Sequence, residues 1–247
     1  DFKEEGGVAM TGVLNAKLAD FATVNLAGSM STFGFGSLDR KVSQVNRTQN
    51  STYDISSNIE LGKFLPKRAN FSIPMYISFA KDTKKPEYSP ISPDLLLNDV
   101  LNSLSPSRRD SLENIVNDVT TRKSINFTNV RKNRGSGDKI HFYDFENFNF
   151  TFAHTQFRNR SYTVENNEVK TYKAIIAYNY QKESKNVKPF NKLIKKGWNI
   201  FKDINMNLAP QVVDVQFMLD RYYNESSYRA TEESSYFIAP STFNKSY

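Results

Sequence analysis

Alternation of apolar and polar residues with a period of two constrains this chain more than any other feature. Between Phe71 and Phe79 every odd position carries a large apolar side chain, whereas Ser72 and Ser78 on even positions are polar. Successive side chains of a β-strand point to opposite faces of the sheet, so this segment predicts a strand with one apolar face. Pro74 lies in the same segment, and a residue without a backbone N–H is unusual in a central strand.

The same alternation recurs along the chain and predicts roughly eight strands in all. It is strong at residues 53–61, 147–153, 171–181 and 213–220, and weaker at Val8–Leu18, Thr23–Thr32 and Ser124–Val130. A polar stretch, Arg40–Ser51, predicts a long loop before the third strand. Most of these strands are long enough to cross a bilayer obliquely, because a transmembrane β-strand needs only ~9–11 residues.

One region breaks the alternation and predicts a helical hairpin. Three prolines between Lys81 and Pro93 indicate an extended loop. Leucines then follow helical spacing from Leu95 to Leu104, and a second helical pattern runs from Leu112 to Val119. We therefore expect a loop followed by a helical hairpin within residues 81–123.

This insertion divides the chain into two groups of strands. We expect about four strands in residues 1–80 and about four in residues 124–225. A short amphipathic insertion is expected near residues 186–203, where a basic cluster surrounds Trp198. The tail, residues 226–247, has no clear period and is expected to be a loop or a partial strand.

The composition removes most of the material for catalysis. The 247 residues contain no Cys and two His, which excludes disulfides and thiol nucleophiles and leaves little for a transition-metal site. A metal or acid–base site could be built from a strand-like stretch that contains His141, Asp144, Glu146 and His154. At ~3.3 Å per residue, however, the eight residues from Glu146 to His154 place this His too far along the strand to share a ligand sphere with the carboxylates. We therefore expect no enzyme activity, no catalytic residues, no metal and no cofactor.

Charge and aromatic content indicate what the chain contacts. The net charge is +7, but the basic residues are scattered, so we expect no nucleic-acid partner. The 19 Phe and 13 Tyr allow two hypotheses: a transmembrane barrel with aromatic girdles, or a soluble β-sandwich that binds a glycan or a protein through surface aromatics. Phe148, Phe150 and Phe152 share one face, and this excess of Phe on single faces favours lipid.

Several runs, taken in order over about residues 8–225, resemble the SprA family. They are Leu18-Ala19-Asp20 through Ala27–Ser37, Glu60–Pro66, Ser72–Ser78, Pro86-Glu87-Tyr88, Pro93-Asp94, Lys123–Lys132 and Asp144–Phe148. SprA proteins are very large outer-membrane β-barrels, linked to gliding motility, that form the protein-conducting translocon of the type IX secretion system in Bacteroidetes. The resemblance implies an all-β fold: a segment of a very large antiparallel transmembrane β-barrel with a short α-helical insertion.

The same resemblance implies a function, a location and partners. The chain would form part of the wall of a channel for protein secretion in the bacterial outer membrane, with no chemistry of its own. Its partners would be outer-membrane lipid, secreted cargo proteins and other translocon subunits, such as a lateral-gate barrel protein and a periplasmic plug. About eight strands close only a narrow barrel filled by its own side chains, so this segment can form only part of the wall. We expect residues 81–123 to lie inside the lumen or at a rim.

Overall fold

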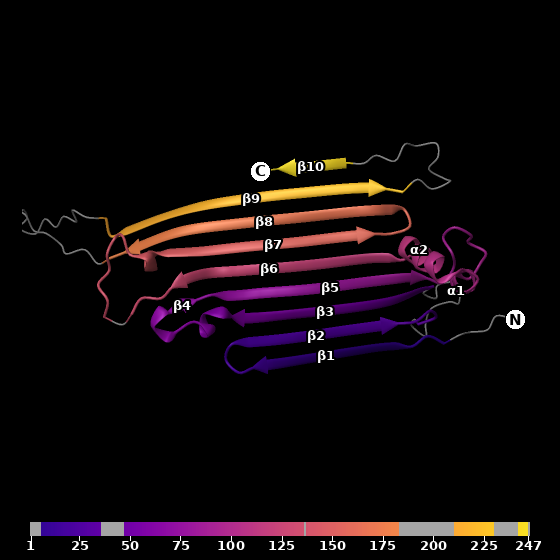
Figure 1. Ribbon diagram of the computed structural model, residues 1–247, viewed down its shortest axis with the longest axis horizontal. Coiled ribbons are helices and arrows are strands. Elements are labelled where there is room, and N and C mark those ends of the chain that lie inside the picture. The colour runs from indigo at the N-terminus through magenta and orange to yellow at the C-terminus, as the bar shows by residue number, and fades with distance from the viewer. Residues whose placement is uncertain (1–5, 36–46, 136, 183–209, 230–241, 247) are drawn as a thin grey trace, which may run out of the picture.

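The computed structural model describes residues 6–35, 47–135, 137–182, 210–229 and 242–246, which form one long antiparallel sheet (Figure 1). The strands are β1 (Ala9–Leu18), β2 (Ala22–Ser31), β3 (Thr48–Glu60), β4 (Phe71–Ser72), β5 (Pro74–Pro86), β6 (Asp118–Lys132), β7 (Phe148–Arg160), β8 (Val164–Gln181), β9 (Val212–Tyr228) and β10 (Thr242–Ser246). Helices α1 (Leu97–Asn102) and α2 (Pro106–Val116) and the 3-10 turns η2 (Leu61–Phe64), η3 (Lys67–Ala69) and η4 (Phe145–Asn147) lie between them.

The strands follow one another through the sheet in chain order. The order is β1-β2-β3-β5-β6-β7-β8-β9-β10, with the two-residue β4 paired to β6, and every pairing is antiparallel. This confirms the predicted antiparallel β fold with a few helices. The order runs from β1 to β10 without returning, so the described residues form an open sheet.

The strands extend further than the alternation predicts. β3 begins at Thr48, inside the expected Arg40–Ser51 loop, and β5 continues to Pro86, inside the expected loop after Lys81. Their ladder pairs Thr48 with Pro86 and needs only backbone groups, so polar side chains do not end it. Pro74 is the first residue of β5, which is the position where a strand tolerates a missing N–H.

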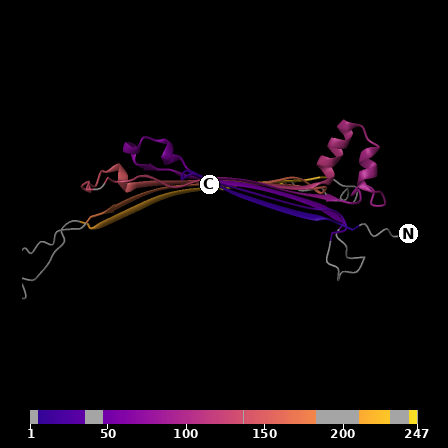
Figure 2. The same cartoon turned by 90° about the horizontal axis from the view of Figure 1, so that it is seen from below.

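The two faces of the sheet differ in chemistry. Because paired residues share a face, the register defines an apolar face, which carries Ile55, Ile77 and Phe217, and a polar face, which carries Ser56, Ser78 and Gln216. In the described residues only five hydrophobic side chains are buried, and three of them form a small core between α1 and α2. Figure 2 shows the sheet edge-on as a single thin layer.

Helices α1 and α2 stand off one side of the sheet (Figure 2). They lie on the apolar side, because Lys85 and Arg160 of that face reach Glu113 at 3.8 Å and Asn114 at 3.0 Å. Figure 1 shows the hairpin at one end of the strands. Val119, expected to be helical, is in β6 because Asn117 is already extended.

Two further predictions meet the limits of the structure. The insertion expected at 186–203, with Trp198, lies outside the described residues. Within the tail, β9 continues to Tyr228, and β10 pairs with the edge of β9 as a short strand.

Among the described helices none has the length and hydrophobicity to span a membrane.

Candidate functional site

The apolar face runs without interruption across eight strands. Its large side chains are Met10, Leu14, Leu18, Leu26, Ile55, Ile59, Met75, Ile77, Phe79, Ile125, Phe127, Phe148, Phe150, Phe152, Ile176, Val215, Phe217 and Leu219. Many are exposed, with Phe217 at 69% and Ile176 at 50%, because the described residues place no second layer on the sheet. An exposed apolar surface of this extent marks a contact with lipid or with another protein.

The opposite face is polar and built mainly from small side chains. One row across the sheet reads Asn15, Asn25, Ser56, Ser78, Ser124, Thr155 and Thr171. Two pairs of opposite charges on this face lie on neighbouring strands: Arg122 contacts Asp82 at 2.6 Å, and Lys173 lies 4.0 Å from Asp220. The neutral amide of Asn159 donates a hydrogen bond to Asp118 at 3.0 Å. Such a face is suited to water.

The border of the apolar face runs obliquely across the strands. On β9 the apolar side chains of this face end at Leu219, before Arg221. On β1 they continue to Met10, the first residue of that strand on this face. The register leads from Leu219 across the sheet to Leu18, which is eight positions from Met10. Eight positions over seven strand-to-strand steps correspond to a slope of roughly 40°, given ~3.3 Å per residue and ~4.8 Å between strands.

An aromatic loop closes one end of the apolar face. The loop between β6 and β7 folds back so that Phe142 packs edge-on against Tyr178 at 5.7 Å and Phe145 packs against Phe148 at 6.2 Å. Phe142, Phe145 and the neighbouring Tyr143, which is 79% exposed, still present most of their rings to the surroundings. The loop therefore adds aromatic surface at the border of the apolar band.

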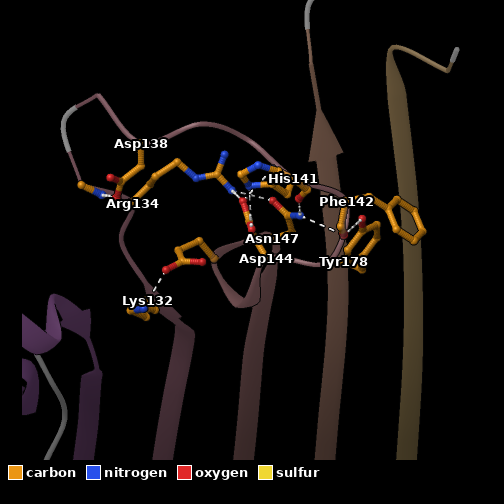
Figure 3. Close-up of polar contacts among 10 residues, drawn as sticks. Lys132, Arg134, Asp138, His141, Phe142, Asp144, Asn147 and Tyr178 are labelled. Atoms are coloured by element: carbon orange, nitrogen blue, oxygen red, sulfur yellow. Dashed lines mark hydrogen bonds and ion pairs between the residues drawn. The ribbon is translucent and has the colours of Figure 1, made fainter.

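A polar network holds this loop in shape (Figure 3). Its centre is Asn147, only 6% exposed, whose amide nitrogen donates to the carbonyls of His141 at 2.9 Å and Phe142 at 3.3 Å. The amide oxygen accepts from Arg134 at 2.9 Å, and Arg134 also pairs with Asp144 at 3.2 Å. Asp144 in turn accepts the backbone N–H of His141 at 2.7 Å. The aromatic rings are thus displayed on a hydrogen-bonded base.

Two further contacts fasten the loop to the strands. The Tyr178 hydroxyl donates to the carbonyl of Phe142 at 2.6 Å. Lys132, the last residue of β6, contacts Glu146 at 2.7 Å. The hydrogen bond from Lys132 lowers the pKa of the Glu146 carboxyl below its ordinary value. A carboxyl whose pKa is lowered in the folded state stabilises the folded loop at pH values above its ordinary pKa. This stabilisation is lost as the pH falls through the pKa of the folded state.

The loop explains why the histidine and carboxylate set does not form one site. His141, Asp144 and Glu146 were expected on a strand but precede β7, in the loop and in η4, and only His154 is on the strand. There it stacks on Tyr172, with its Nδ1 at 3.1 Å from the carbonyl oxygen of Thr171. The described residues hold no group of three potential metal ligands.

We expect Asn147→Ala to open the aromatic loop. The change removes three hydrogen bonds and leaves the Arg134 guanidinium and two carbonyls without this partner, at a cost of about 1–3 kcal/mol. Hydrogen exchange at His141, Asp144 and Asn147 should become faster, because these amides are bonded within the loop. Lys139→Ala is the control, since this exposed residue lies in the same loop. Unchanged exchange in Asn147→Ala would contradict the role given to this amide.

Sequence reasoning did not find the network around Asn147. The alternation of rings from Phe148 onward suggested that the strand began earlier than it does. The available signal was the stretch Asn133–Asp138, which contains two glycines directly after β6 and is typical of a turn.

Comparison with protein families gives a match for the first part of the chain. Residues 1–101 match the model of the SprA N-terminal region, described as a motility related/secretion protein. This range covers β1 to β5 and most of α1. No curated protein matches the chain.

Proposed function

Over residues 1–101 the chain belongs to the SprA family of motility related/secretion proteins, and from this premise we propose that its sheet is part of the wall of an outer-membrane protein-conducting channel. The observation that carries the proposal is the oblique apolar band on a sheet that has no second layer in the described residues. The apolar face meets lipid and the polar face lines a wet lumen.

The slope of the band supports a membrane-spanning arrangement. Strands of transmembrane barrels are tilted by ~35–45° from the membrane normal. If the band lies in the plane of the bilayer, its roughly 40° slope gives the strands a tilt within this range. A β-sandwich module, the alternative for this composition, would need a second sheet over the apolar face, and the described residues supply none.

The aromatic loop fits the border of such a band. Aromatic rings concentrate at membrane–water interfaces, where an apolar ring and a polar tip can both be satisfied. Phe142, Tyr143 and Phe145 extend the apolar face at its end, while Asn147 and Arg134 keep the loop backbone hydrogen-bonded. This loop would mark one edge of the bilayer.

The open sheet fits a segment of a larger wall. Its edges at β1 and β10 would pair with further strands of the same barrel, because unpaired strand edges are not tolerated in a bilayer. In this proposal the channel serves type IX secretion and gliding motility in a bacterial outer membrane. Its contacts are outer-membrane lipid, secreted cargo, a lateral-gate barrel protein and a periplasmic plug, and the wall performs no chemistry of its own.

Cysteine accessibility tests the proposal directly, because these 247 residues contain no cysteine. Gln216 and Phe217 are neighbours on β9 and occupy the polar and the apolar face. In the intact protein reconstituted in lipid vesicles, Gln216→Cys should react readily with a membrane-impermeant maleimide. Phe217→Cys should be protected until detergent is added. Equal labelling of the two positions in lipid would overturn the assignment of the faces.

A further inference from the structure

A basic cleft lies on the apolar face, just beyond the apolar band and next to the helical hairpin. It has a volume of about 330 Å³ and is lined by Phe79, Lys81, Val119, Thr121, Lys123, Gln156, Arg158 and Arg160. Four of these eight residues are cationic and none is acidic. Phe79 and Val119 provide an apolar part of the wall, so the cleft joins positive charge to an apolar surface.

The cations of this cleft have no carboxylate partner within the described residues. Arg158 donates to the side chain of Asn166 at 2.8 Å and Arg160 to that of Asn114 at 3.0 Å, both of them neutral amides. Lys123 has its ammonium 6.0 Å from the centre of the Phe79 ring. By contrast, Arg122 on the polar face is paired with Asp82 at 2.6 Å.

One acidic side chain, Glu168, adjoins the cleft and interacts with Arg158 through space without a direct contact. Glu168 is opposite Arg158 in the register, but it contacts Lys170 at 2.7 Å and accepts a hydrogen bond from Gln156. No residue of the hairpin lines the cleft, and its Glu113 pairs with Lys85 and Arg109. The cleft therefore carries an excess of positive charge on one face of the sheet, with four cations and no acid in its lining.

We propose that this cleft binds the phosphate of an anionic lipid headgroup. The inference rests on the proposed function, in which the adjoining apolar band is in contact with acyl chains. A headgroup phosphate would then lie one step beyond the band, at the level of Lys81, Lys123 and Arg158. Guanidinium and ammonium groups are the usual partners of phosphate oxygens, and anionic lipids attract basic residues at the membrane surface.

The test compares two charge-matched variants of the intact protein. Lys81→Gln/Lys123→Gln removes two cations of the cleft, and Lys17→Gln/Lys84→Gln removes two exposed lysines of the polar face. Binding of phosphatidylglycerol to the detergent-solubilised protein is measured by native mass spectrometry, with phosphatidylcholine as the zwitterionic reference. The cleft variant should bind phosphatidylglycerol roughly thirtyfold more weakly, since each lysine near an anionic surface contributes about a factor of five. The control variant should bind as the wild type does.

The outcomes separate this inference from the proposed function. Equal loss of phosphatidylglycerol binding in both variants, or no loss in either, overturns the proposal that the cleft binds the lipid. Inorganic phosphate that competes at the same concentration as the lipid overturns the lipid assignment in favour of a free-ion site. Cysteine labelling at positions 216 and 217 in the cleft variant reports on the wall independently. If position 216 is still labelled and position 217 still protected while lipid binding is unchanged, the lipid-binding proposal for the cleft is wrong, and the proposal that the sheet is part of a channel wall remains supported.

Discussion

Replacing Ile77 with arginine should destabilise the sheet in a lipid bilayer by about 2–4 kcal/mol, the cost of a charged side chain on the lipid face near the midplane. Ile77 is on β5 in the middle of the apolar face, between Ser57 and Ile125 in the register. It is 44% exposed, and its register partners Ser57 and Ile125 carry no carboxylate that could pair with a guanidinium. The penalty arises from the bilayer and not from packing within the sheet.

The neighbouring residue supplies the control for this prediction. Ser78 is on the polar face, between Ser56 and Ser124, so Ser78→Arg places the same charge in water. The measurement is urea-induced unfolding of the intact protein in lipid vesicles, followed for both variants. A lipid-facing Ile77 requires a large shift for Ile77→Arg and a small one for Ser78→Arg. Equal shifts, or a neutral Ile77→Arg, would remove the basis for the lipid assignment.

The strands could be predicted because their signal is local. Each alternation, such as that between Phe71 and Phe79, is read from neighbouring positions and depends on the fixed two-residue period of a strand. The ends of the strands were less predictable, as the extension of β5 to Pro86 demonstrates. There the partner strand provides the hydrogen bonds, and this information is not contained in residues 81–86 themselves.

The slope of the apolar band needs information that no single strand holds. Alternation identifies the apolar side of β1 and of β9, but the offset between Met10 and Leu219 emerges only from seven successive registers. The same is true of the basic cleft, whose lining residues come from β5, β6 and β7. Lys81, Lys123 and Arg158 are far apart in the sequence and meet because of the pairing.

The aromatic loop could not be predicted from the sequence for a different reason. Asn147 and Arg134 are thirteen positions apart and connected through a hydrogen bond that forms only when the chain reverses. Asp144 and Glu146 fall on the same even positions as Phe148, Phe150 and Phe152, so the period of two can be continued beyond the strand that it describes. Residues with helical or turn geometry can satisfy a period of two by chance over short stretches.

Replacing Leu101 with alanine should unfold the helical hairpin and leave the sheet intact. Leu101 is 1% exposed and packs with Leu97 and Val116 in the only hydrophobic cluster of buried residues in the described part of the chain. Truncation of a buried leucine typically costs about 2–5 kcal/mol, and a core of three buried residues has little left to replace the lost contacts. The strand ladders do not include these side chains, so their stability should be retained.

Hydrogen exchange resolves the two regions in one experiment on the intact protein. In Leu101→Ala the amides of residues 97–116 should lose protection, while those of β7 and β8 keep theirs. Leu95→Ala is the matched control, because Leu95 is 53% exposed and lies before α1, where its truncation should change stability by no more than about 0.5 kcal/mol. Loss of protection in β7 and β8 would mean that the hairpin and the sheet unfold as one unit. Protection that persists throughout 97–116 would mean that other contacts hold the hairpin without its core, such as the bridge between Tyr88 and Leu96 in the preceding loop and the bond from Arg160 of β7 to Asn114.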